Sequence, residues 1–491
     1  MASSYKHGVY TSEQATSMVA PVLGTAGLQV IIGTAPVNMT ADPSAAVNTP
    51  ILANNYKEAV EAVGYSDDFA KYTLCEAISA TFSVVNTGPI ILINVLNPAT
   101  HKTALTGGTV QVNSNVAVLD EVGAIIDSTL SVSIPASGED EAVALTRGTD
   151  YTTSFNNDGT LNLIMVSARA QAATTLTVAG NKVNPTAVTA SDIIGGVNAS
   201  TGAETGLEVI RQIYPKFNMT PGILVAPRFS QDATIAAALQ AKTKEINGVF
   251  KCVCVIDIDS ASASGAKKYT DVKQRKEVQA VSDPNAYAVW PMAAVGDVIY
   301  SGSSLAAALT AYVDAVNDDT PNVSPSNKTL AISMACLADG TEVVLDQDQA
   351  NTINSFGVAT FLNMNGFRLW GNNTAAYPGN TDPKDRWFSV RRFLSWAANT
   401  FILTYFQRVD SPANKRLIEA IVDSENVRGN GFVARDVCAR YEITFNEDEN
   451  QTTDLLNGKL TFHQYITPYT PAEDIEDVIE FDPDALSEAL S

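Results

Sequence analysis

Apolar residues along the first 370 positions alternate between short continuous runs and stretches with helical spacing. Continuous runs lie at 28–33, 90–95, 221–226, 249–258, 286–290 and 358–362. Runs of this length that are apolar on both faces predict the buried strands of a parallel sheet. The spacing between them predicts helices at 56–85, 231–246 and 303–316, and Ser230 is placed to cap the second helix. This alternation predicts an α/β domain.

One segment interrupts the alternation. Residues 103–192 are rich in Thr, Val, Ser, Ala and Gly, and their two aromatic residues are Tyr151 and Phe155. Short strand-like runs at 109–119, 130–134, 161–166 and 175–178 are separated by turn residues, which is typical of a small β-sandwich. We therefore expect a β-rich insertion at 101–192 that divides the α/β domain into parts at 21–100 and 193–370.

A third pattern follows over residues 371–467 and predicts an α+β domain. A long helix is marked by Trp387, Val390, Leu394, Ala397, Phe401 and Tyr405. Ser411 and Pro412 predict the start of a second helix, and Gly429 and Gly431 predict its end. Two alternating strands are then expected, carried by Tyr441, Ile443 and Phe445 and by Leu460, Phe462 and Ile466.

Both ends of the chain have the character of extended arms. Residues 1–20 are small and polar without a helical or strand period. Residues 468–491 are acidic and contain a thin apolar thread at Ile475, Val478, Ile479 and Phe481. A charge run alone is typical of a disordered tail, but the apolar thread favours a segment that pairs with another chain.

Charge is distributed unevenly along the chain. Of the net charge of -22, residues 441–491 contribute thirteen acids and one base, whereas residues 384–440 carry ten bases and six acids. The acidic total argues against nucleic-acid binding, which needs a basic surface. The layout predicts that the acidic end of one subunit meets a basic part of the next, or that the basic part faces another protein. Candidates for that basic surface are Arg386, Arg391, Arg392, Lys415 and Arg416.

The five cysteines are scattered, which predicts buried free thiols and a reducing compartment. No segment has the character of a targeting signal, and the apolar run at 394–406 is shorter than the ~20 residues that a membrane span needs. These features predict a soluble protein made in a cytoplasm and not inserted in a membrane.

Catalytic and metal-binding patterns are absent from the sequence. The three histidines, His7, His101 and His463, lack an adjacent nucleophile motif. Asp257 and Asp259 end a predicted strand, and Asp346 and Asp348 form a second pair; strand-end or capping carboxylates are the favoured interpretation, with a divalent cation as the alternative. The Arg391-Arg392 pair favours a solvated rim or salt bridge over a phosphate site. We therefore expect no enzyme, metal or cofactor.

Several segments together resemble the tail sheath proteins of contractile phage tails and related contractile particles, including tailocins. The resemblance covers about 1–100 and 193–480. It is carried by Gly27–Pro36, by the helix and strand over 72–95, by Pro221–Ser230 with Arg228 where glycine is usual, by Gly366–Thr374, by Arg391-Arg392, by Gly458–Leu460, and by Pro468, Pro471, Glu473 and Ile475.

The resemblance implies a subtilisin-like central domain without a catalytic triad. It implies subunits that stack as hexameric rings around an inner tail tube, and that contract to drive the tube into a target cell. Arms would add strands to the sheet of a neighbour. Implied partners are further copies, the tube, the baseplate and the tail terminator; the implied location is a virion or tailocin tail assembled in the host cytoplasm. A different filament or a surface-layer subunit is the alternative function.

Overall fold

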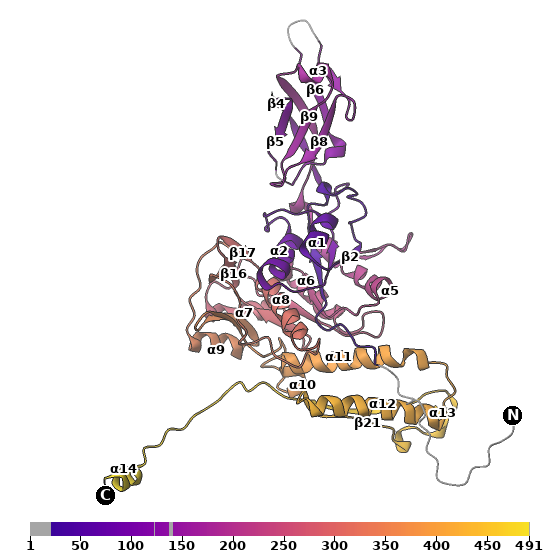
Figure 1. Cartoon of the computed structure of the whole chain (residues 1–491), viewed down its shortest axis with the longest axis vertical. Coiled ribbons are helices and arrows are strands. Elements are labelled where there is room, and N and C mark those ends of the chain that lie inside the picture. The colour runs from indigo at the N-terminus through magenta and orange to yellow at the C-terminus, as the bar shows by residue number, and fades with distance from the viewer. Residues whose placement is uncertain (1–20, 122, 137–140, 491) are drawn as a thin grey trace, which may run out of the picture. The chain divides into compact units, whose positions relative to one another are not determined.

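The computed structural model describes residues 21–121, 123–136 and 141–490 (Figure 1). It divides into two compact units. Among the described residues, the larger unit comprises 25–393 and 470–490, and the smaller comprises Leu394–Tyr469 with 21–24. The arm predicted at 1–20 lies outside the described residues.

The larger unit is built on an eight-stranded sheet in the order β2-β3-β1-β13-β14-β15-β19-β20. The six inner strands are parallel, and β2 and β20 pair antiparallel at the edges. All six predicted apolar runs are the inner strands, which confirms the α/β character. The bounds are β1 Gln29–Gly33, β2 Pro50–Ala53, β3 Ile90–Asn94, β13 Ile223–Val225, β14 Val253–Asp257, β15 Ala286–Val289, β19 Val358–Asn363 and β20 Phe367–Trp370.

Helices pack against these strands, among them α2, α6, α8 and α9. The predicted helix at 303–316 is α8, most of whose residues are buried. The bounds are α1 Tyr56–Val63, α2 Thr73–Ser79, α6 Ala233–Lys242, α7 Val272–Val278, α8 Gly302–Ala315 and α9 Gln347–Ser355. The larger unit also contains a small three-stranded sheet. Its strands are β16 Met292–Val295, β17 Val298–Tyr300 and β18 Met334–Cys336.

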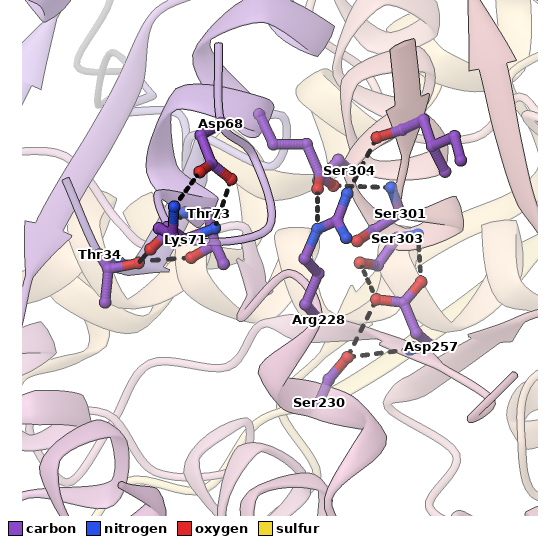
Figure 2. A network of polar contacts seen from close by, with 12 residues as sticks. Thr34, Asp68, Lys71, Thr73, Arg228, Ser230, Asp257, Ser301, Ser303 and Ser304 are labelled. Atoms are coloured by element: carbon purple, nitrogen blue, oxygen red, sulfur yellow. Dashed lines mark hydrogen bonds and ion pairs between the residues drawn. The ribbon is translucent and has the colours of Figure 1, made fainter. Parts of the chain in front are cut away.

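The single helix predicted over 56–85 is wrong. α1 stops at Gly64, whose φ of 78° lies in the left-handed region that glycine adopts without strain. The following loop is fixed at its end by Thr34, whose hydroxyl donates to the Lys71 carbonyl at 2.7 Å and accepts from the Thr73 N–H at 3.2 Å (Figure 2). Helix α2 then begins, and it continues as a π-helical turn over Ala80–Val85.

The predicted cap at Ser230 is also wrong. Helix α6 begins at Ala233, and the Asp232 side chain accepts the N–H groups of Thr234 and Ile235. Ser230 is buried and its hydroxyl faces Asp257 instead. Asp232 caps the helix in place of Ser230 because it lies directly before the first helical residue and carries a negative charge, which the helix N-terminus stabilises.

Residues 102–183 form a seven-stranded antiparallel sheet in the order β7-β6-β10-β4-β5-β9-β8, with its own apolar core. The run predicted at 109–119 is two strands, because Ser114 and Asn115 both have positive φ and turn the chain. The long strand β4 joins the two halves of the sheet. The bounds are β4 Lys102–Asn113, β5 Val116–Leu119, β6 Ser131–Ile134, β7 Val143–Leu145, β8 Tyr151–Phe155, β9 Leu161–Met165 and β10 Thr175–Val183.

The smaller unit contains most of α11 Phe388–Tyr405, then α12 Lys415–Ala434, β21 Cys438–Thr444, α13 Thr452–Leu456 and β22 His463–Pro468. Two helix boundaries predicted for α12 are wrong. Asn414, not Ser411, caps its start by accepting the Leu417 N–H at 2.9 Å. At the other end the helix continues through Gly429 and Gly431.

Candidate assembly surfaces and a closed polar cluster

The carboxyl ends of the central strands hold a buried polar cluster (Figure 2). Asp257, the last residue of β14, accepts the Ser303 N–H at 2.7 Å and lies 3.2 Å from the Ser230 hydroxyl. The Ser303 hydroxyl also donates to it. Burial raises the pKa of the Asp257 carboxyl to about 6, although the hydrogen bonds from Ser303 and Ser230 oppose that rise.

A second carboxylate lies beside the first. Glu76, on α2, is fully buried and forms an ion pair with the Arg228 guanidinium at 2.6 Å. It also accepts the Ser301 N–H at 2.7 Å and the Ser304 hydroxyl at 2.9 Å. Arg228 in turn donates to the Ile299 carbonyl at 2.9 Å. The cluster is therefore closed by its own partners and holds the end of the sheet to α2 and α8.

Asp259 and Asp346, one from each aspartate pair, have partners within the chain. Asp259 is ion-paired with Arg275 at 2.7 Å; burial acts to raise its pKa, but hydrogen bonds from Ser262 and the backbone hold it below the ordinary value. Asp346 forms a capping box with Gln349 at the start of α9. Across the described residues, no group of three or more His, Cys, Asp or Glu side chains is arranged to hold a metal ion.

The histidines have local structural partners. His101 Nδ1 accepts the Asn97 N–H at 3.0 Å, and its Nε2 lies 3.5 Å from Asp192. His463 lies 3.3 Å from Glu449. His7 lies outside the described residues. All five cysteines are buried and free, as the sequence predicts.

The predicted C-terminal strands form a two-stranded antiparallel sheet, with Tyr441 opposite Ile466 and Ile443 opposite Gln464. Tyr441 and Ile443 are buried, and Ile466 is half-buried. Leu460, Phe462 and Phe445 lie just outside the strand bounds, although the rings of Phe445 and Phe462 pack 5.4 Å apart. A sheet of two strands leaves backbone groups unpaired at its edges, and such edges are templates for another strand.

Helix α12 occupies one of these edges. The Asn426 carboxamide accepts the Ile443 N–H at 2.8 Å and donates to the Ile443 carbonyl at 3.1 Å, as a neighbouring strand would. Three residues on, Gly429 lies so close to the Tyr441 carbonyl that a Cβ would overlap it. Because the outer edge of β21 is covered in this way, the edge that is left without a strand partner among the described residues is that of β22.

The C-terminal segment exposes its apolar thread. Ile475, Val478, Ile479 and Phe481 are each between 69% and 88% exposed, which is unusual for residues of this type. The residues from Tyr469 to Phe481 form neither helix nor strand, and α14 Pro483–Ala489 follows them. The segment therefore has the exposed apolar side chains that a donated strand requires.

At the other end of the chain, the residues just after the undescribed arm lie along α11. The Val22 N–H donates to the Thr404 hydroxyl at 3.0 Å, and the Gly24 N–H donates to Thr400 at 3.1 Å. Trp396 donates to the Gly24 carbonyl at 2.8 Å. These bonds fix the point from which the N-terminal residues continue.

The candidate basic residues are mostly engaged within the chain. Arg392 is 3% exposed and its guanidinium is ion-paired with buried Asp314, so its prediction as a partner-facing residue is wrong. Arg391 contacts Asn285 and Asp385, and Arg386 is paired with Glu473. Lys415 is largely exposed beside Glu419, and Arg416 is exposed. The sequence could not show these contacts, because the partners are far away along the chain: Asp314 is 78 positions from Arg392, Asn285 is 106 from Arg391 and Glu473 is 87 from Arg386.

The sequence analysis did not single out Asn426, and it interpreted Gly429 only as the end of a helix. Both residues lie inside α12. Only their contacts with β21 reveal their role. Among the described helices, none is long and apolar enough to cross a membrane.

Comparison with known proteins finds tail sheath proteins of phages among the relatives of this chain. The chain is 27% identical over 482 residues to the tail sheath protein of Burkholderia phage BcepMu, covering 96% of each chain. It is 28% identical over 305 residues to the tail sheath protein of Escherichia phage P2, covering 59% of this chain and 70% of that one. The chain is a homologue of phage tail sheath proteins. No family model matches it.

Solved structures of contractile injection systems share the fold of this chain. The sheath complex of the extracellular contractile injection system PVC in its contracted state aligns over 99% of both chains, with a TM-score of 0.57 at 13% identity. A chain of the anti-feeding prophage baseplate aligns over 97% of this chain and 98% of its own length, also with a TM-score of 0.57 and 13% identity.

Proposed function

We propose that this chain is the structural subunit of a contractile tail sheath, in a phage or a related injection particle. The observation that carries the proposal is the exposed apolar thread at the C-terminus, in a chain whose homologues over nearly its full length are sheath proteins. Four exposed apolar side chains in one segment are unfavourable in a monomeric protein. In a polymer whose subunits exchange strands, these side chains would be buried.

The thread has the pattern of a strand. In an extended conformation Ile475, Ile479 and Phe481 project to one face, with Asp477 between them, and Glu476, Val478 and Glu480 project to the other. Seated on a neighbour, the apolar side chains of the first face would be buried, and the carboxylates of Glu476 and Glu480 on the opposite face would stay in water. The same carboxylates keep the segment soluble before assembly.

The open edge of β22 is the acceptor in this proposal. Alternate residues of β22 direct their backbone groups away from β21. Gln464 is on that side because its partner Ile443 directs its own groups to Asn426, and Ile466 is on the same side because it lies two residues further along the strand. A donated strand would bond to these groups. N-terminal residues of a further subunit extend the same mesh.

In the assembled particle the subunits form hexameric rings stacked around an inner tail tube, and they contract to drive the tube through the target envelope. The tube, the baseplate and the tail terminator are the other partners, and the particle assembles in the bacterial cytoplasm. The α/β domain serves as a rigid, subtilisin-like body without catalysis. The closed cluster around Asp257 and Glu76 supports this, since its carboxylates are occupied by internal donors.

Substitution on the apolar face of the arm tests the proposal. The triple variant Ile475→Asp, Ile479→Asp, Phe481→Asp should remain a folded monomer and form no tubes, because the donated strand can no longer be buried. The matched control is Glu476→Gln, Glu480→Gln on the opposite face, which should form tubes. Sedimentation and electron microscopy report the outcome, and tubes of normal length from the triple variant would refute the proposal.

A further inference from the structure

Two motifs that the sequence analysis singled out, Gly366–Thr374 and the Pro471-x-Glu473-x-Ile475 segment, meet at one side chain in the larger unit. Arg386 Nε donates to the Asn373 carboxamide oxygen at 2.9 Å, and its Nη2 pairs with Glu473 at 2.7 Å. Arg386 and Glu473 are 87 positions apart in the sequence. Arg386 therefore ties the segment around Glu473 to the loop that carries Asn373.

The guanidinium is held on its faces as well as its edges. Its central carbon lies 4.6 Å from the ring centroid of Tyr377 and 4.0 Å from that of Trp387. An arginine suits this place because its plane stacks on aromatic rings while its edges donate in a fixed geometry. A partly exposed ion pair alone contributes little, but this one is formed by a guanidinium that is already fixed in position.

The platform beneath the arginine is itself anchored. The buried Lys276 ammonium donates to the carbonyls of Phe356, Ala375 and Tyr377 at 2.6, 2.7 and 3.0 Å. The Asn373 side chain donates to the Asn354 carbonyl at 3.2 Å. These bonds hold the loop that carries Asn373 and the Tyr377 ring.

The chain changes character directly after Glu473. Residues 471–475 border a groove of about 690 Å³ whose other walls come from this platform, among them Asn351, Trp370 and Tyr377. Glu473 is about one-third exposed, whereas Ile475 is 85% exposed. The ion pair therefore marks the point at which the C-terminal segment leaves the body of its own subunit.

We propose that Arg386 is a positioning residue for assembly: it latches Glu473 and so fixes the origin and direction of the C-terminal arm. The inference rests on the proposed sheath function. With the latch closed, residues 474–482 are the free strand, which spans about 30 Å when extended. With it open, the free segment begins after Pro468, the end of β22.

Releasing the latch lowers the effective concentration of the arm at its acceptor edge. The free segment lengthens from nine residues to fourteen, and the effective concentration of a tethered group falls as roughly the -3/2 power of linker length. Each joint then weakens roughly twofold. Since every subunit in a sheath forms such a joint, the critical concentration for tube formation should rise at least in that proportion.

The first test measures arm position in the monomer, without assembly. Spin labels at Lys273→Cys and Glu476→Cys report the distance distribution between the body and the arm, and the five native thiols are buried. The distribution should be narrow for the native latch and broad for Arg386→Glu and for Glu473→Arg. The swapped pair Arg386→Glu, Glu473→Arg should narrow it only in part, because the charges are again opposite but the guanidinium is no longer stacked on Tyr377 and Trp387. Equal widths in all four proteins would overturn the latch.

The second test measures the critical concentration for tubes by sedimentation. Arg386→Glu and Glu473→Arg should each raise it about twofold or more, and the swap should lower it toward the native value. Lys384→Glu is the matched control, because it makes the same charge change on the same short helix, Pro383–Arg386, beside Asp382. An equal effect of Lys384→Glu, or no effect of the single latch variants, would overturn the positioning role. Absence of tubes from the native chain would instead refute the sheath function, and the label distances still decide the latch.

Discussion

At the scale of single residues, Arg228 shows how a buried charge is given a partner where the backbone conformation is unfavourable. Its φ of 62° is a conformation that glycine adopts more easily, and glycine is the residue that the resemblance to sheath proteins implies at this position. The guanidinium neutralises Glu76, which is fully buried. The sequence exposes the substitution, but only the structure supplies its reason, because Glu76 is 152 positions away.

Arg228→Gly should destabilise the protein. Relief of the backbone contributes about 1 kcal/mol, whereas an uncompensated buried carboxylate costs about 3–5 kcal/mol. We therefore expect the free energy of unfolding to fall by about 2–4 kcal/mol in urea titrations. The double variant Glu76→Gln, Arg228→Gly is the control and should recover much of the loss. A single variant as stable as the native chain would contradict the account.

Asp257 should make stability depend on pH. Its pKa in the folded protein, about 6, lies above the ordinary 3.8, so the folded state retains a proton that the unfolded state releases between these values. The free energy of unfolding from this group therefore falls as pH rises from about 4 to 6, by at most about 3 kcal/mol. Asp257→Asn lacks the effect.

The measurement for Asp257 is the difference in unfolding free energy between Asp257→Asn and the native chain at pH 4 and pH 7. Other titrating groups cancel in this difference. The free energy of unfolding of Asp257→Asn, relative to that of the native chain, should be higher at pH 7 than at pH 4. A difference that stays constant across the range would show that burial of this carboxylate has no net electrostatic consequence.

At the scale of elements, apolar periodicity predicted the inner sheet well and failed where tertiary contacts override local preference. Six apolar runs became six parallel strands, because strands buried on both faces leave a clear pattern. Helix α12 runs through two glycines because its neighbour β21 lies against one of them. Arg392 was expected at the surface, but it is buried in an ion pair with Asp314. Neither contact leaves a local pattern.

The two glycines of α12 form a matched pair for a test. Gly429→Ala would force the Tyr441 carbonyl away from the helix and should destabilise the smaller unit by about 1–3 kcal/mol. Gly431 is exposed with open space around it, so Gly431→Ala should stabilise by about 0.5–1 kcal/mol through helix propensity. Urea unfolding compares the two, and equal effects would show that the helix does not close this strand edge.

At the scale of the whole molecule, the candidate surfaces followed from the sequence only in outline. The alternating strands and the acidic thread were visible, whereas the closure of one sheet edge by Asn426 and the Arg386–Glu473 pair depend on folding. The domain division, the partner-facing role of Lys415 and Arg416, and the subtilisin-like character of the central domain stay predictions.

The seven-stranded insertion should be dispensable for assembly. Its first and last strands pair at Lys102 and Val183, so the chain enters and leaves at one point. We expect it on the outer surface of the sheath. Replacing residues 102–183 by a short Gly-Ser linker should leave a soluble protein that forms tubes. Soluble monomers alone would show that the insertion takes part in subunit contacts.

The most direct measurement of the central claim is negative-stain electron microscopy of the purified full-length chain beside a chain ending at Glu473. The full-length protein should form hollow, striated tubes. The shortened protein should keep its circular dichroism spectrum and remain monomeric, because it retains the latch residue but lacks the donated strand. Normal tubes from the shortened chain, or a full-length protein that never assembles, would contradict the account.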